Sequence, residues 1–221
     1  MQPGHPFSIS LVLLAGLVLL CAGIAATLGY LHIPLREVGA VFTAKLLQRP
    51  IAPDIEATTI SVLTNVRLPR ILAAILIGGS LAICGAVFQA VLLNPLADPY
   101  TLGISTGAAF GASLVIVLQI FGLALPTAIS VPIFAFLGGM ATLAVVLYLA
   151  AGDSRMSSTT LILAGVIVSA ILSAAIGFFK FLADEQVGII IFWLMGSLAG
   201  VSWGQLQMLA PITLAGAVLL C

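Results

Sequence analysis

Two serines stand in a pattern that can present a nucleophile. Ser105 and Ser202 each lie at the centre of a G-x-S-x-G stretch. A serine in this pattern can attack an acyl group, but it needs a neighbouring base to accept its proton. The only histidines, His5 and His32, lie at or beyond the ends of the first apolar run. We therefore expect no catalytic residue, and an intramembrane serine hydrolase that uses Ser105 is a remote alternative.

Close helix packing accounts better for the glycines of such stretches. Gly107 and Gly111 are four residues apart, as are Gly78 and Ala82. Small residues at this spacing let two helix backbones approach each other closely. We predict that Gly78, Gly107 and Gly111 lie at helix contacts.

Nucleotide and ion chemistry are both disfavoured. The chain has no G-x-x-x-x-G-K-[ST] motif, because its only lysines, Lys45 and Lys180, follow Ala44 and Phe179. The apolar runs also lack the chain of ionisable groups that a proton relay needs. If the protein moves a solute uphill, a partner must therefore supply the energy.

The three cysteines carry no metal or redox signal. Cys21, Cys84 and Cys221 all lie in apolar runs without C-x-x-C spacing. Buried cysteine usually acts as a small hydrophobic residue. We expect no disulfide, no metal site and no cofactor.

Arg67 and Arg70 flank Leu68-Pro69 where the second apolar run begins. Since proline suits the first turn of a helix, the motif predicts a helix N-terminus here. Two cations at that position would oppose the helix macrodipole by about 0.3–1 kcal/mol each. Either the arginines snorkel to lipid head groups, or they receive carboxylates from another protein.

Two turns follow, with different compositions. The first is a rigid stop in which two prolines bracket an acid, formed by Asn94, Pro95, Asp98 and Pro99. The second, at 152–160, is short and rich in hydroxyl groups. Its side chains either cap the next helix or line the mouth of a pore. The residues concerned are Ser157, Ser158 and Thr159.

Composition places these motifs in a membrane. Of 221 residues, 62% are hydrophobic and 6% are charged, with a formal net charge of zero. Soluble domains are about 45–50% apolar and about 25% charged. Nucleic-acid binding is excluded, because it needs a basic patch. The chain is therefore predicted to be an all-α, polytopic membrane helical bundle.

Long uncharged runs predict about six spans of roughly 20 residues each. The piece 187–197 is too short to cross and is expected to form a re-entrant segment or half-helix. The last span is still apolar at Cys221, so we expect a domain covering 1–221 that is incomplete at its C-terminus. The N-terminus lacks the basic residues of a signal peptide. The predicted spans are 8–30, 68–92, 101–119, 129–150, 157–180 and 204–221.

The segment 31–67 between the first two spans is predicted to be a loop that contains a short amphipathic helix at 34–48. Leu35, Val38, Phe42 and Leu46 share one face of that helix. The helix either lies on the membrane surface or forms part of a solvated loop.

These motifs, taken together, resemble the signature region of the FecCD-type permeases. The pieces that carry the resemblance are RLPR, G-A-x-x-Q, NPLADP and LG-x-S-x-GA, followed by LILAGVIVSAILSA and FWLMGSLAG in the family's order. FecCD-type permeases are the membrane subunits of bacterial ABC importers for iron-siderophores, haem and cobalamin. The family usually has about ten spans, whereas this chain has room for about six at roughly 20 residues each.

The resemblance implies function, location and partners. It implies a multi-pass protein of the bacterial inner membrane that imports a metal chelate. It implies pairing with a second permease copy, either identical or homologous, and binding to cytoplasmic ATP-binding subunits and an extracytoplasmic solute-binding protein. Membrane lipid is a further partner, and the subunit itself is not an enzyme. The alternative is a non-transporting or degraded membrane scaffold subunit.

The resemblance also implies site residues and an orientation. Arg67 and Arg70 would dock the solute-binding protein at the outer surface, and Ser157, Ser158 and Thr159 would form a gate at the inner mouth of the path. The family's inside N-terminus makes 31–67 extracytoplasmic. Six basic residues then lie outside and only Arg155 inside, against the positive-inside rule. We follow the resemblance on orientation.

Overall fold

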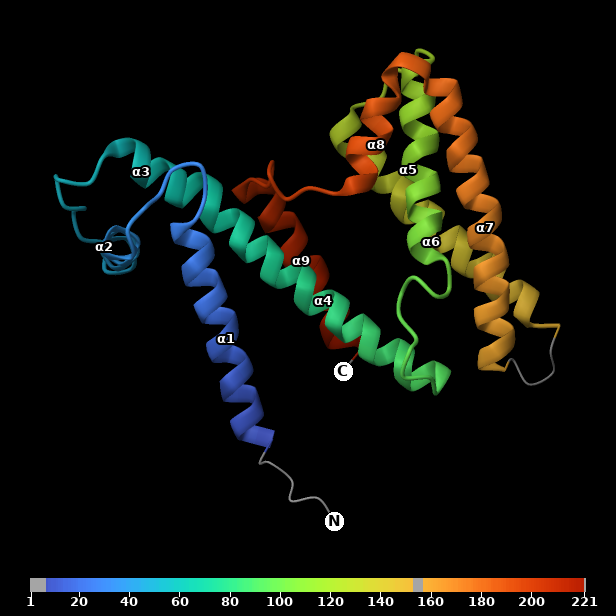
Figure 1. Cartoon of the computed structure of the whole chain (residues 1–221), viewed down its shortest axis with the longest axis horizontal. Coiled ribbons are helices and arrows are strands. Elements are labelled where there is room, and N and C mark those ends of the chain that lie inside the picture. The colour runs from blue at the N-terminus through green and yellow to red at the C-terminus, as the bar shows by residue number, and fades with distance from the viewer. Residues whose placement is uncertain (1–6, 153–156, 221) are drawn as a thin grey trace. The chain divides into compact units, whose positions relative to one another are not determined.

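The structure is a computed structural model that describes residues 7–152 and 157–220, with side chains from residue 9 onward. Within these ranges every regular element is a helix, which confirms the predicted all-α class (Figure 1). The chain divides into two compact units, one made of 1–80 and 198–221 and the other of 81–197. Arg155, on which the inside charge count depends, and Cys221 lie outside the described residues.

The first unit contains the N-terminal and C-terminal helices. A small core of Ile33, Val41, Ile55 and Leu63 fixes its loop segments against the helices. Its helical elements are α1 (Phe7–Thr27), α2 (Leu35–Leu46), α3 (Ala57–Ser61), η1 (Val62–Arg67), the first part of α4 (Leu68–Leu92) and α9 (Trp203–Leu220).

The predicted amphipathic helix is α2, but it packs through a different face. Val41 is its buried residue and joins the core of the first unit. Leu35, Phe42 and Leu46, which the sequence pattern grouped as the apolar face, are 66%, 55% and 74% exposed. Val38, Ala40 and Val41 are the α2 residues that pack in this core, and the larger apolar side chains of α2 point away from it.

The second unit is a bundle in which α5 packs against α6, α7 and α8. Two buried apolar clusters hold it together, one around Val146 and Ala150 and one around Val115 and Ile190. Its elements are the end of α4, α5 (Ile104–Ile120), α6 (Thr127–Ala150), α7 (Ser158–Ala183), η2 (Asp184–Gln186) and α8 (Val187–Met195).

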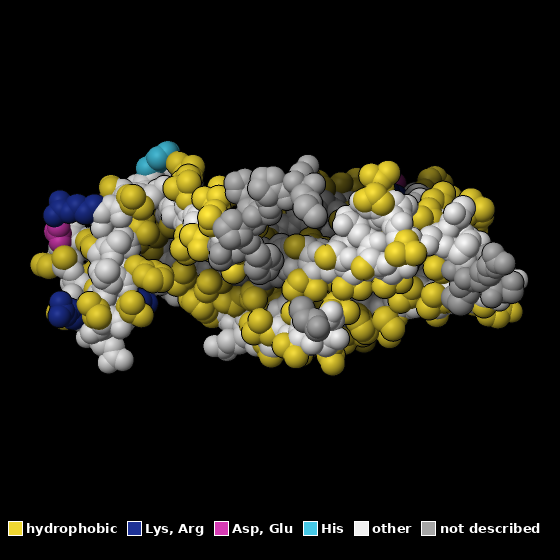
Figure 2. Space-filling model, turned by 90° about the horizontal axis from the view of Figure 1, so that it is seen from below, with side chains coloured by type: hydrophobic (Ala, Val, Ile, Leu, Met, Phe, Trp, Pro, Cys, Tyr) yellow, Lys and Arg dark blue, Asp and Glu magenta, His cyan; other side chains and the backbone are white. Residues whose placement is uncertain are grey.

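Apolar surface covers the helices in the way that a bilayer requires. Five helical stretches are long and apolar enough to cross a membrane, and α5 is a shorter apolar helix. In α1, Leu13 and Leu19 are 68% and 72% exposed, because apolar residues occur on every side of this helix. Figure 2 shows hydrophobic side chains over most of the face that it presents. The five long stretches and α5 correspond to the six predicted spans, and α8 corresponds to the predicted half-helix.

The second span begins earlier than the sequence predicted. Helical structure runs without a break from Ala57 to Leu92 rather than starting near residue 68. Pro69 lies within it, and a proline clashes with the carbonyl four residues before it. The π-helical stretch Val62–Arg67, in which the Leu68 N–H reaches the Leu63 carbonyl, widens the turn just before Pro69 and accommodates the ring. The prediction of a helix N-terminus at Arg67 is therefore wrong.

Candidate functional site

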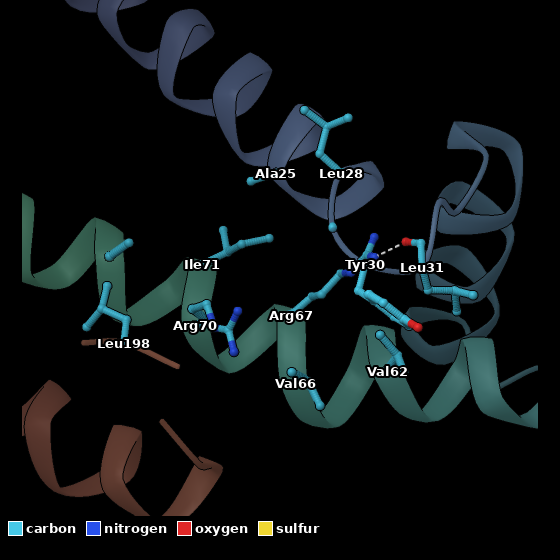
Figure 3. Close-up of a pocket in the computed structure, with 12 residues that line it drawn as sticks. Ala25, Leu28, Tyr30, Leu31, Val62, Val66, Arg67, Arg70, Ile71 and Leu198 are labelled. Atoms are coloured by element: carbon cyan, nitrogen blue, oxygen red, sulfur yellow. Dashed lines mark hydrogen bonds between the residues drawn. The ribbon is translucent and has the colours of Figure 1, made fainter. Parts of the chain in front are cut away.

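Arg67 lies inside the first unit and is only 8% exposed. Its guanidinium donates one hydrogen bond to the carbonyl of Leu31 (Figure 3) and another to the carbonyl of Ala26. Ala26 is in the last turn of α1, where carbonyls lack partners within the helix and a cation is electrostatically favoured. Arg67 therefore closes the C-terminus of α1 and holds the chain that leaves it.

A glycine makes this approach possible. A Cβ at Gly29 would lie 2.8 Å from the Arg67 Nη2 atom. Any larger residue at this position would have to displace the guanidinium. Arg67 therefore does not oppose a helix macrodipole. It lies within the continuous helix Ala57–Leu92 and beside the C-terminus of α1, where a cation is favourable.

Arg70 lies one turn further along and is half-buried. Its Nη2 atom donates to the carbonyl of Ala199 over 2.8 Å, and its Nε atom is buried with no hydrogen-bond partner among the described residues. A guanidinium has five N–H donors in a planar fork. Only the Nη2 atom of Arg70 donates a hydrogen bond among the described residues, so the Nη1 donors, and not the buried Nε, are left for an anionic group from outside the chain.

The two arginines border a cavity of about 540 Å³ in the first unit (Figure 3). Its other walls are mainly apolar, including Leu28, Val66 and Leu198. In this setting a charged hydrogen bond is stronger than in open water. The arrangement can receive a carboxylate at Arg70, whereas Arg67 is already committed to backbone carbonyls.

Trp203 is a residue that the sequence did not single out. Its indole N–H donates to the carbonyl of Thr64 over 2.8 Å, in the π-helical stretch. The hydrogen bond from Arg70 to the carbonyl of Ala199 also joins the N-terminal part of the first unit, 1–80, to its C-terminal part, 198–221. The partners are more than a hundred residues apart in the chain, so no local pattern indicates them.

The hydroxyl-rich turn opens α7, and its first member is a cap. The Ser157 Oγ atom accepts a hydrogen bond from the Thr160 N–H over 3.2 Å, as an N-cap does. Ser158 is half-buried and Thr159 is exposed. The turn residues 153–156 lie outside the described part of the chain.

The proline-bracketed turn is held by its own side chains. Asn94 Oδ1 accepts from the Leu96 N–H over 3.0 Å. Asp98 Oδ1 accepts from the N–H groups of Tyr100 and Thr101 over 2.9 and 2.8 Å. These bonds satisfy the backbone where Pro95 and Pro99 interrupt the helical pattern. The turn leads from α4 to the start of α5.

The two G-x-S-x-G stretches are placed differently. Ser202 and Gln205 exchange side-chain to backbone bonds of 3.0 and 3.4 Å, which is the capping box of α9. Ser105 is in the first turn of α5 and borders a second cavity together with Lys180. No hydrogen bond links Ser105 to a base within the described residues, so the structure offers no activated nucleophile there.

The packing glycines also differ from one another. A Cβ at Gly107 would overlap the Thr142 Oγ1 atom and lie 2.6 Å from the Gly138 carbonyl oxygen, and one at Gly111 would overlap the Phe134 carbonyl. Both glycines lie where α5 meets α6. At Gly78 a Cβ would meet nothing within 4 Å among the described residues. A packing role for Gly78 therefore stays a prediction about a neighbour outside the described chain.

Comparison with known proteins finds a match to the FecCD transport family over residues 13–221. The chain is 39% identical over 195 residues to the uncharacterized ABC transporter permease protein YvrB of Bacillus subtilis, covering 87% of this chain and 54% of that protein. It is 35% identical over 209 residues to the molybdate import system permease protein MolB of Haemophilus influenzae, covering 92% of this chain and 58% of that protein.

A solved structure, described as an inward-facing conformation of a metal-chelate type ABC transporter, matches with a TM-score of 0.73 and 29% identity. The match covers 96% of this chain and 61% of that one. The chain spans about half the length of the curated relatives it matches. Since the family match extends over nearly all of the chain, this multi-pass membrane protein belongs to the FecCD transport family of ABC transporter permeases.

Proposed function

We propose that the chain is the membrane-spanning permease subunit of an ATP-driven importer for a metal chelate of the iron-siderophore, haem or cobalamin type. The observation that carries this proposal is the FecCD family match over residues 13–221 on a fold of apolar helices. The likeness to a metal-chelate type transporter supports the substrate class. A relative named for molybdate makes a small oxyanion the competing substrate.

The proposal includes the partners of such an importer. The sequence has no nucleotide-binding loop, so cytoplasmic ATP-binding subunits would hydrolyse the ATP and the permease would not be an enzyme. A second permease copy, identical or homologous, would complete the path. The assembly would lie in the bacterial inner membrane, with the segment 31–67 on its outer side.

Docking of the solute-binding protein is proposed at Arg70. Both arginines were expected to dock it, but Arg67 is buried and bonded to carbonyls of its own chain. Arg70 is half-buried, and only its Nη2 atom donates a hydrogen bond among the described residues, so its Nη1 donors are left for a partner. A carboxylate of the binding protein that meets Arg70 would fix the register of the complex and speed its formation.

Replacing Arg70 by Glu should weaken docking, most visibly at low salt, where charges are least screened. The measurement is the association rate of the solute-binding protein with the permease in nanodiscs over a salt series. We expect a decrease of at least about tenfold at low salt, because a favourable charge pair becomes a repulsive one. Arg36→Glu makes the same charge change at an exposed position of the first unit and serves as the control. Equal rates for the two variants would exclude Arg70 as the docking residue.

The turn at the start of α7 is proposed as the cytoplasmic gate. Ser157 has a capping bond, so the gate role falls mainly on Ser158 and Thr159. Because Thr159 is exposed, a tryptophan can replace it without disturbing a core. Thr159→Trp should block uptake in the assembled importer and leave its assembly intact. Thr43→Trp, at an exposed position of α2, should leave uptake unchanged. Normal uptake by the Thr159→Trp variant would show that this turn only begins α7 and is not a gate.

A further inference from the structure

A second cavity, of about 570 Å³, lies wholly within the second unit, between α5, α7 and α8. Hydroxyl groups and one ammonium group line it, together with small and apolar side chains from the same helices. Its polar and aromatic lining consists of Tyr100, Ser105, Thr106, Ser173, Lys180 and Trp193.

Packing holds the walls of this cavity in place. Phe110 on α5 and Phe179 on α7 stack with ring centroids 5.3 Å apart and an interplanar angle of 29°. Phe179 directly precedes Lys180 in α7. On α7 and α8, Ala183 and Ile190 are 3% and 0% exposed and belong to one buried cluster with α5. The position of the Lys180 backbone is therefore fixed by its neighbours on both sides.

Lys180 is the only charged residue that lines the cavity. It is half-buried, and within 7–152 and 157–220 it forms no ion pair or hydrogen bond. The nearest acids in the sequence, Asp184 and Glu185, are exposed and do not pair with it. A lysine that lines a cavity without a described partner can bind an anion there, and the surrounding hydroxyls can donate to the same anion.

We infer that this cavity binds an anionic oxygen group of the transported solute, a carboxylate or an oxyanion, with Lys180 as the counter-charge. Ser105 and Thr106 supply neutral donors beside it. The inference rests on the proposed import function and narrows it to a solute with negative charge. The phosphate of a lipid head group has the same chemistry, and Lys180 lies in the last turn of a membrane helix where a lipid could reach it. The test must separate these two sources.

Lys45 serves as the internal reference for that test, because Lys45 and Lys180 are the only lysines in the chain. Lys45 is exposed on α2. The full chain is placed in phosphatidylcholine nanodiscs and treated with an amine-acetylating reagent, and the acetylation rate of each lysine is measured by mass spectrometry. The anionic probes are ferric citrate and molybdate, and the uncharged probe is the neutral ferric hydroxamate ferrichrome.

We expect an anionic probe at ten times its Kd to slow acetylation of Lys180 about tenfold, since protection follows occupancy. Lys45 should react at an unchanged rate, and ferrichrome should not protect Lys180. Ser105→Ala should raise the probe concentration needed for protection. The wild-type chain alone decides the question if this variant folds poorly.

Three results would overturn the inference. The first is equal acetylation of Lys180 with and without anionic probes. The second is equal protection by ferrichrome, which would mean that charge is not recognised. The third is protection by phosphatidylglycerol nanodiscs without any probe, combined with no effect of the probes in phosphatidylcholine, which would assign the site to lipid. The assay needs neither ATP nor uptake, so a failed uptake measurement with protection intact would count against the proposed function alone.

Discussion

Replacing Gly107 by Ala should abolish most of the folded protein. The added methyl group would overlap the Thr142 Oγ1 atom and lie 2.6 Å from the Gly138 carbonyl oxygen. Because that oxygen belongs to the backbone of α6, the clash is relieved only if α5 and α6 move apart. Overpacking costs typically about 1–3 kcal/mol, and we expect at least about 3 kcal/mol here. The measurement is the yield of monodisperse protein and its melting temperature in detergent.

Gly78→Ala is the matched control, since a Cβ there meets nothing within 4 Å among the described residues. In the interior of a helix, replacing glycine by alanine stabilises the folded state by about 0.5–1 kcal/mol. The control should therefore be as stable as the wild-type protein or slightly more so. If Gly107→Ala behaves like Gly78→Ala, then α5 and α6 do not pack through Gly107.

Replacing Arg67 by Ala should also unfold much of the protein, for an electrostatic reason. Two carbonyl oxygens, of Ala26 and Leu31, would lose their donor. A buried acceptor without a partner costs about 1–3 kcal/mol, and the lost donor is charged, so we expect about 3 kcal/mol in total. A lower melting temperature and faster proteinase K cleavage within 28–34 would report the loss.

Arg67→Lys should recover only part of this stability, because a compact ammonium cannot span two carbonyls as a planar guanidinium does. Arg36→Ala, at an exposed position, should change the free energy of unfolding by less than about 0.5 kcal/mol. Wild-type stability in Arg67→Ala would contradict the role of Arg67 as the clamp on the end of α1.

Much of the fold could be predicted from the sequence because charge marks the limits of the spans. The predicted spans 8–30, 129–150 and 204–221 lie within uncharged runs and agree with α1, α6 and α9 to within three residues at each end. The start of the second span was missed for a specific reason. Pro69 resembles a first-turn proline, and only the three-dimensional structure has the π-helical turn that admits it within a longer helix.

The candidate site was less predictable, because its contacts join distant parts of the chain. The bonds of Arg67 reach residues 41 and 36 positions away, so nothing near the RLPR motif indicates a buried clamp. The proximity of Lys180 to Ser105 depends on how α5 and α7 pack. The cap formed by Ser202 was legible as S-x-x-Q, but the overlapping G-x-S-x-G pattern was interpreted as close helix packing, with a nucleophile only as a remote alternative.

ATP-dependent uptake of a metal chelate tests the central claim most directly. The chain is reconstituted in proteoliposomes with its ATP-binding subunits and solute-binding protein, and uptake of the iron-labelled chelate bound by that protein is followed with ATP or with a non-hydrolysable analogue. Our account predicts accumulation that requires ATP and both partners and that is lost in Thr159→Trp. Failure of the chain to associate with the ATP-binding subunits, or association without any ATP-dependent uptake, would contradict it and favour a non-transporting scaffold.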